Sequence, residues 1–218
     1  MLELSMQIEI WSDIVCPWCY LGKRRLEQAL DAFDHRDEVD LVYRSFELDP
    51  SAPADATSPT VELLASKYGM TVKQAEDAQR QMEQRAAADG LTFRLDELRR
   101  GNTRDAHRLL QLARVSGRQD ELVERLHRAY FTEQDSVFDH AALRRLAIEA
   151  GLEPAEVDKV LATDQFSDEV TADEMTASSL GATGVPFFVI DRRYAVSGAQ
   201  PADTLGMALQ RAWADSQA

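Results

Sequence analysis

The spacing of apolar and polar residues predicts a strand, a helix and a second strand at the start of the chain. Residues 7–11 alternate polar and apolar side chains with a period of two, which is typical of a strand. Residues 21–33 instead repeat apolar side chains every three or four positions, which indicates an amphipathic helix. Residues 39–48 favour a second strand. A strand–helix–strand unit of this length predicts that the two strands are parallel.

The long middle of the chain predicts helices almost throughout. Residues 49–59 are rich in Pro and turn-forming residues and indicate a loop. From about residue 60 to residue 168, apolar side chains recur at helical spacing and glycines interrupt the pattern. The clearest helices are expected at residues 71–89, 104–115, 121–131, 141–150 and 154–162, with Gly90, Gly101, Gly117 and Gly151 between them.

The C-terminal part returns to strands after a helix at residues 168–179. The apolar run at 185–190 is, by length and content, a buried strand. Residues 191–193 form a tight turn, and residues 194–197 form its short antiparallel partner. An amphipathic helix at residues 202–214 follows.

This order of elements, β-α-β, then a helical block, then β-β-α, predicts an α/β protein. The outer parts together make a complete α/β unit, into which the helical block is inserted. We therefore expect one domain from residues 6–50 and 169–218, and an inserted helical domain at residues 51–168. A chain of 218 residues is long enough to bury a large core without disulfides.

The charge balance disfavours two classes of partner. The chain has 24 Lys and Arg against 38 Asp and Glu, a formal net charge of −14. An acidic surface repels nucleic-acid phosphates and anionic lipid, so we expect neither nucleic acid nor a membrane as partner. No apolar run approaches the ~20 residues of a membrane span, and residues 1–6 lack the basic start of a secretory signal. We therefore expect a soluble, cytoplasmic protein.

The candidate chemistry lies in Cys16-Pro17-Trp18-Cys19, between the first strand and the first helix. Pro17 suits the first position of a helix, where a missing N–H costs nothing, and cysteines three apart share one helix face. The positive end of the helix dipole and its free N–H groups stabilise a thiolate. We expect Cys16 to be exposed and nucleophilic, and Cys19 to be shielded and to act as the resolving thiol.

Two other roles for the cysteines are open on these residues alone. The chain has 2 cysteines, which excludes a disulfide framework and a four-cysteine zinc site. Half of a metal site would need more ligands, and His35, His107, His127 and His140 lack the H-x₃₋₅-H spacing. Two inert, buried cysteines are the other alternative. A C-x-x-C pair beside a βαβ unit in a cytosolic chain favours a thioredoxin-like redox motif without metal.

Four separated motifs, in the right order, make the chain similar to a known family. They are Trp-Ser-Asp-Ile-Val-Cys-Pro-Trp-Cys-Tyr-Leu-Gly at 11–22, Phe-Glu-Leu-Asp-Pro at 46–50, Asn-Thr-Arg-Asp-Ala-His-Arg-Leu at 102–109 and Gly-Val-Pro-Phe-Phe-Val at 184–189. Over nearly the whole chain they resemble the FrnE-like, DsbA-family oxidoreductases of the thioredoxin-fold superfamily. The resemblance implies a thioredoxin-like fold with a large inserted all-helical domain.

The resemblance also implies a proline beside the cysteine pair. Val185–Pro186 is expected to be a cis peptide packed against Cys16 and Cys19. The backbone of Val185 is then left to pair with an extended substrate. The alternative for Pro186 is an ordinary proline at a strand edge.

Several further residues have both a functional and a structural interpretation. Asn102, Thr103 and His107 match a family stretch that faces the active-site cleft. Alternatively, Asn102 caps a helix that begins near Thr103, and His107 is a half-buried helix residue. Asp13 either tunes the first cysteine, accepts a proton during resolution, or caps its loop. Trp18 stands where periplasmic DsbA has a histidine, so that cation is absent and we expect a less oxidising redox couple.

Together these observations predict a thiol-disulfide oxidoreductase or isomerase that acts on proteins or peptides with disulfides or dithiols. No cofactor is expected to be bound, glutathione is a candidate redox partner, and a homodimer is an open alternative. Two other functions remain open. The related 2-hydroxychromene-2-carboxylate isomerases and kappa-class glutathione transferases use bound glutathione on a small molecule, usually with serine at the position of Cys16. In the second alternative, the helical block is a peptide-binding, chaperone-like module.

Overall fold

The computed structural model of the protein describes residues 6–54 and 58–217. The two ends of the chain contribute to one compact unit, and the middle of the chain forms another. The first, which we call the sheet unit, comprises Met1–Leu48 and Glu169–Ala218. The second, which we call the helical unit, comprises Asp49–Asp168.

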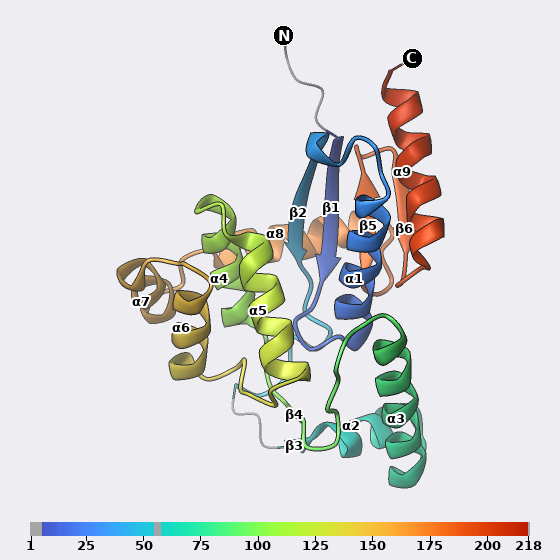
Figure 1. The fold of residues 1–218 in the computed structure, drawn as a ribbon. Helices are drawn as coiled ribbons and strands as arrows, with labels where there is room; N and C mark the ends of the chain where they lie inside the picture. The colour runs from blue at the N-terminus through green and yellow to red at the C-terminus, as the bar shows by residue number, and fades with distance from the viewer. Residues whose placement is uncertain (1–5, 55–57, 218) are drawn as a thin grey trace. The chain divides into compact units, whose positions relative to one another are not determined.

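The sheet unit is built on a four-stranded mixed sheet with the strand order β2-β1-β5-β6 (Figure 1). β1 (Met6–Ser12) is parallel to β2 (Val39–Ser45), which follows a one-turn 3₁₀ helix, η1 (Arg36–Glu38). β5 (Phe187–Ile190) is antiparallel to β1, and β6 (Tyr194–Ser197) is antiparallel to β5. The predicted parallel pair and the predicted C-terminal hairpin are both confirmed.

Helices cover both faces of this sheet (Figure 1). α1 (Pro17–Asp31) and α9 (Ala202–Ser216) pack against each other on one face. α8 (Ser167–Ser179) crosses the other face, where the indole N–H of Trp11 donates to the Asp173 carbonyl oxygen at 2.8 Å. A core cluster on this second face contains Trp11, Ala177, Phe187 and Val189.

Strand β2 ends at Ser45, three residues earlier than the sequence pattern predicts. Carboxylates from α8 accept backbone N–H groups where this strand ends. Asp173 Oδ2 accepts from Ser45 N at 3.0 Å, and Glu174 Oε1 accepts from Glu47 N at 3.1 Å. These two bonds satisfy backbone donors at the C-terminal end of β2 and just beyond it.

A buried carboxylate lies inside this unit. Glu9 on β1 is 1% exposed and is held by two guanidinium groups. Arg44 donates to Glu9 Oε1 from Nη2 at 2.7 Å, and Arg192 donates to Glu9 Oε2 from Nε at 2.6 Å. Burial raises the pKa of Glu9, but the hydrogen bonds and charges of Arg192 and Arg44 outweigh it, so the pKa is lowered from its ordinary value of 4.5.

The turn between β5 and β6 carries Arg192 and holds its guanidinium group beside Glu9. Asp191 and Arg192 have φ values of 48° and 54°, and Arg193 N donates to Ile190 O at 3.0 Å. Positive φ at two successive turn residues favours Asn and Gly, because other side chains there cost about 1 kcal/mol each. The ion pair between Arg192 and Glu9 offsets part of that cost.

We expect Glu9→Gln to lower the free energy of unfolding by about 2 kcal/mol, because a neutral amide leaves charged guanidinium donors incompletely paired. The folded-state pKa of Glu9 lies below 4.5, so its carboxylate stabilises the fold above the unfolded-state pKa. That stabilisation is lost as the pH falls through the folded-state pKa. Urea denaturation at neutral and acidic pH measures both effects.

The matched control is Asp77→Asn, which removes an exposed carboxylate that pairs with Arg80 and, at 3.8 Å, with Lys73. Its expected effect is within about 0.5 kcal/mol. Equal stability of Glu9→Gln and the wild type, with the same acid dependence, would show that the buried ion pair does not stabilise the sheet unit.

The helical unit contains the predicted helices and a small sheet that the sequence pattern does not predict. β3 (Ser58–Pro59) pairs antiparallel with β4 (Arg99–Arg100). The expectation of an all-helical insertion is therefore wrong in this detail, because two-residue strands are too short to show a period. The helices of this unit are α2 (Thr60–Tyr68), α3 (Val72–Ala88), α4 (Arg104–Val115), α5 (Gln119–Phe131), α6 (His140–Glu149) and α7 (Pro154–Ala162).

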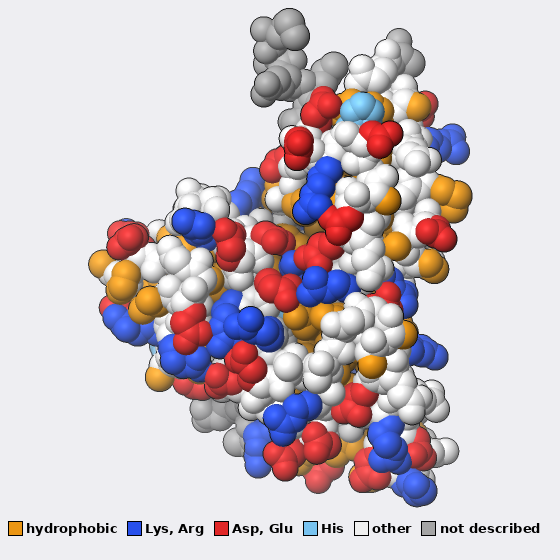
Figure 2. Space-filling model, viewed as in Figure 1, with side chains coloured by type: hydrophobic (Ala, Val, Ile, Leu, Met, Phe, Trp, Pro, Cys, Tyr) orange, Lys and Arg blue, Asp and Glu red, His pale blue; other side chains and the backbone are white. Residues whose placement is uncertain are grey.

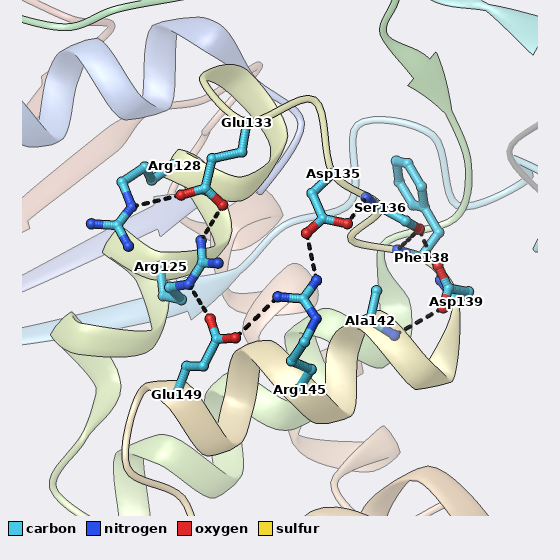
Figure 3. Close-up of polar contacts among 10 residues, drawn as sticks. All are labelled: Arg125, Arg128, Glu133, Asp135, Ser136, Phe138, Asp139, Ala142, Arg145 and Glu149. Carbon is cyan, nitrogen blue, oxygen red and sulfur yellow. Dashed lines mark hydrogen bonds and ion pairs between the residues drawn. The ribbon is translucent and has the colours of Figure 1, made fainter.

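A chain of ion pairs joins α5 to α6 (Figure 3). Arg125 donates to Glu133 at 2.8 Å and to Glu149 at 2.7 Å. Arg145 donates to the second oxygen of Glu149 at 3.1 Å and also binds Asp135. These contacts fix the loop between the two helices to the helices themselves.

On the face shown in Figure 2, the acidic side chains do not form one continuous patch, because Lys and Arg side chains are interspersed with Asp and Glu. Within the described ranges, 6–54 and 58–217, no helix is long and apolar enough to cross a membrane.

Candidate active site

The two cysteines lie at the start of α1, after the short loop that follows β1. Cys16 is the residue before the helix, with extended backbone angles of φ −92° and ψ 111°, and Pro17 occupies the first helical turn. The Cys16 N–H donates to the Asp13 carbonyl oxygen at 3.1 Å, and Cys19 N–H donates to the Cys16 carbonyl oxygen at 3.0 Å. This places the Cys16 side chain at the N-terminal end of α1, which is the positive end of the helix dipole.

Both cysteines are free, and both are buried. Cys16 is 4% exposed and Cys19 is 2% exposed, so the expectation of an exposed Cys16 is wrong. The physical reason includes a distant segment: Cys16 Sγ lies 3.7 Å from the carbonyl oxygen of Val185 and donates to it. Trp18, between the cysteines, is instead 37% exposed. The motif therefore exposes the indole of Trp18 to solvent rather than a thiol.

The environment of Cys19 favours the protonated thiol. Burial raises the pKa of Cys19 well above its ordinary value, and the hydrogen bond and charge of Cys16 raise it further. Hydrogen bonds from the Ser12 side chain and the Asp13 backbone act in the opposite direction and do not outweigh burial. Ser12 is a contact that the sequence did not single out, although it lies within the quoted motif at 11–22.

The segment facing Cys16 contains the expected cis peptide, Val185–Pro186. The Pro186 carbonyl oxygen accepts from Gly198 N at 2.8 Å, which ties this segment to the end of β6. Pro186 also packs on α1: a Cβ built on Gly22 would lie 2.8 Å from Pro186 Cγ. Gly22 thus permits the close approach of α1 and the proline.

The Asp13 carboxylate joins two loops. Asp13 is buried, and its Oδ2 accepts from the backbone N–H of Leu48 at 2.8 Å. This bond holds the segment after β2 against the loop that carries Cys16. The contact supports the loop-capping interpretation of Asp13.

Asn102, Thr103 and His107 lie at the start of α4 in the helical unit. Asn102 precedes Thr103, the N-cap of α4, and its Oδ1 accepts from the first N–H of the helix, that of Arg104, at 2.9 Å. Thr103 is buried just before that turn, and His107 is fully buried within α4. Asn102 therefore has a structural role at the start of α4, although the N-cap position itself belongs to Thr103. A place for these residues in an active-site cleft stays a prediction.

Another residue of the same motif, Arg108, has a structural role. Its guanidinium donates to Gln165 O at 2.8 Å and to the carbonyl oxygens of Val160 and Thr163, and it pairs with Asp105 at 2.7 Å. These bonds satisfy carbonyl groups at and beyond the C-terminal end of α7.

Comparison with known proteins identifies the family. The model of the DsbA-like thioredoxin domain matches residues 7–210. A probable DsbA oxidoreductase from Streptomyces coelicolor has 51% identical residues and a TM-score of 0.92, covering 96% of this chain and 90% of that one. The uncharacterised protein YwbO of Bacillus subtilis is 27% identical over 86% of this chain and 88% of its own.

More distant structures share the fold. The cytosolic disulfide reductase DsbM of Pseudomonas aeruginosa, solved with GSH, is 16% identical with a TM-score of 0.64, over 94% of this chain and 98% of that one. The expected thioredoxin-like α/β fold is confirmed. With a family model spanning nearly all of both units, and a sheet, cysteine pair and cis proline arranged as described, the chain belongs to the DsbA-like thioredoxin domain family.

Proposed function

We propose that the protein is a thiol-disulfide oxidoreductase or isomerase in which Cys16 is the nucleophile and Cys19 is the resolving thiol. The observation that carries this assignment is the difference between the two sites. Cys16 lies at the N-terminal end of α1, at the positive end of the helix dipole and beside the Val185 carbonyl. Burial raises the pKa of Cys19, which favours a thiol until a mixed disulfide has formed.

The reaction conserves thiols and electrons at each step. The Cys16 thiolate attacks one sulfur of a substrate disulfide, a mixed disulfide forms, and the other substrate sulfur leaves as a thiolate that takes up a proton. Cys19 then loses its proton and attacks Cys16 Sγ, which releases the second substrate thiol. Two electrons pass from the protein to the substrate, and Cys16 and Cys19 become a disulfide. The reverse sequence oxidises a dithiol, and repeated attack and release rearranges disulfides.

The segment around the cis peptide supports a peptide or protein substrate. The Val185 carbonyl lies 3.7 Å from the Cys16 sulfur, so main chain is available beside the reacting atom. A substrate segment in extended form can pair with such main chain while its own cysteine reaches Cys16. We further propose that residues 6–50 and 169–218 form the catalytic domain, with residues 51–168 as an inserted domain.

We expect a redox potential less oxidising than the roughly −120 mV of DsbA, in the range of about −200 to −270 mV. Trp18 supplies no positive charge beside Cys16, and a cation there stabilises the reduced thiolate form. Equilibration with a reference dithiol protein measures the potential. Trp18→His is expected to make it less negative by about 30 mV or more, which is a tenfold change in the equilibrium constant. A wild-type value as high as that of DsbA contradicts this explanation.

Reaction of the reduced protein with a peptide that carries one disulfide tests the proposal. After an acid quench, mass analysis should show reduced peptide and a Cys16–Cys19 disulfide in equal amounts. Two results would overturn it. Tight binding of glutathione without reduction of the peptide would favour an isomerase or transferase acting on a small molecule. Suppression of aggregation that a Cys16→Ser/Cys19→Ser double variant retains in full, without peptide reduction, would favour a chaperone-like module.

A further inference from the structure

A second feature of chemical interest lies wholly within the helical unit. A cavity of about 210 Å³ is lined by residues of α2, by Arg100 on β4 and by Asp49. Its walls combine apolar and polar side chains, and several of them are exposed, so the cavity opens to solvent. The lining residues are Asp49, Leu63, Leu64, Ser66, Lys67 and Arg100.

Arg100 is the residue that makes this cavity unusual. Its Nε and Nη2 atoms are buried and have no hydrogen-bond partner among the residues that the structure describes. A buried donor without a partner costs about 1–3 kcal/mol, and a charged donor costs more. Native proteins seldom keep such groups unless a ligand, ion or water satisfies them.

The backbone that carries Arg100 is held in place. Arg100 pairs with Ser58 across the β3–β4 ladder, and the preceding carbonyl, of Arg99, accepts from the Tyr130 hydroxyl at 2.9 Å. A guanidinium on a fixed backbone is suited to bind a planar or tetrahedral oxyanion through two N–H groups. The site is therefore organised before any ligand arrives.

The other charges of the lining leave it net positive. Lys67 supplies a second cation at the rim, and Asp49 supplies one carboxylate. Asp49 Oδ1 already accepts from the Ser51 hydroxyl at 2.7 Å. A positive cavity stands out in a chain whose formal net charge is −14. Ligand pockets for drug-sized molecules are about 300–1,000 Å³, so this smaller cavity suits an anionic group rather than a large molecule.

We propose that this cavity binds an oxyanion, the phosphate or carboxylate group of a small molecule, with Arg100 as the main donor and Lys67 as a second cation. Leu63 and Leu64 provide apolar surface for the part of the ligand that carries the anion. The site is independent of the thiol chemistry, since none of its residues takes part in the proposed reaction.

Titration of the full-length protein with inorganic phosphate and, separately, with acetate tests this proposal at constant ionic strength. The readout is the NMR signal of the Arg100 Nε–H group, assigned by its loss in Arg100→Gln, together with calorimetry. We expect saturable binding of at least one anion. Binding of phosphate alone indicates a phosphorylated ligand, binding of acetate alone indicates a carboxylate, and both results support the site.

Variants of the lining residues should change the affinity for the anion in opposite directions. Arg100→Gln and Lys67→Gln should each weaken binding, the former by about tenfold or more, and Asp49→Asn should strengthen it. Arg80→Gln, on the exposed surface of α3, is the matched control and should leave binding unchanged. Lys67 is exposed, so its variant decides the matter if Arg100→Gln does not fold. Absence of saturable binding, or wild-type affinity in Arg100→Gln or in Lys67→Gln, would overturn the proposal.

Discussion

Cys16→Ser is expected to reduce disulfide exchange to the uncatalysed rate, whereas Cys19→Ser is expected to stop the reaction after its first step. A serine hydroxyl is not ionised at neutral pH and cannot form the mixed disulfide, so the first variant loses the nucleophile. The second variant keeps the nucleophile at the N-terminal end of α1 but lacks the thiol that resolves the adduct. The two substitutions remove one sulfur each from buried positions, which makes them matched controls for one another.

Mass spectrometry of the reaction with a disulfide peptide measures this difference directly. Cys19→Ser should accumulate a covalent protein–peptide adduct at Cys16, and Cys16→Ser should accumulate none. Circular dichroism of both variants establishes that each is folded. Accumulation of the adduct in Cys16→Ser rather than in Cys19→Ser would reverse the assigned roles, and full turnover by Cys16→Ser would remove Cys16 from the mechanism.

Gly22→Ala is expected to destabilise the sheet unit and to slow disulfide exchange. The new Cβ would lie 2.8 Å from Pro186 Cγ and 3.3 Å from Phe188 Cζ. A proline ring cannot rotate away, so either α1 or the segment holding Val185 and Pro186 must shift. Overpacking of this kind costs about 1–3 kcal/mol. A shift of that segment also moves the Val185 carbonyl relative to Cys16 Sγ, which is why activity should fall together with stability.

Gly206→Ala is the matched control, because it makes the same change inside α9 of the same unit. Apart from the backbone of α9 around it, no atom of the described residues lies within 4 Å of a Cβ built there, so the substitution should stabilise the helix by about 0.5–1 kcal/mol. Thermal denaturation and the rate of peptide reduction are compared across the wild type and both variants. The packing explanation fails if Gly22→Ala is as stable and as active as Gly206→Ala.

The sequence predicts the elements whose apolar residues follow a local period. The helix at 104–115 is observed at the predicted bounds because its apolar side chains recur on one face. The turn at 191–193 and the strand at 194–197 are also observed where predicted. The strand predicted at 185–190 begins only at Phe187, because Pro186 has no N–H to contribute to a ladder.

Contacts between residues far apart in the chain could not be read from local patterns. Cys16 is buried partly because Val185 lies against it, and 169 positions separate the two residues. Alternation along β1 marks Glu9 as polar but does not reveal that Arg192 crosses from a distant turn to neutralise it. Gly22 lies within a motif that the sequence singled out, yet only the approach of Pro186 shows why a glycine stands there.

The most direct test of the proposed function counts free thiols in the full-length protein after equilibration with glutathione buffers of graded ratio. Acid quench, alkylation and peptide mapping then locate any disulfide. The proposal predicts a single reversible two-electron transition, from two free thiols to a Cys16–Cys19 disulfide. If the pair never closes, and glutathione is bound tightly at every ratio instead, the protein is not a dithiol oxidoreductase.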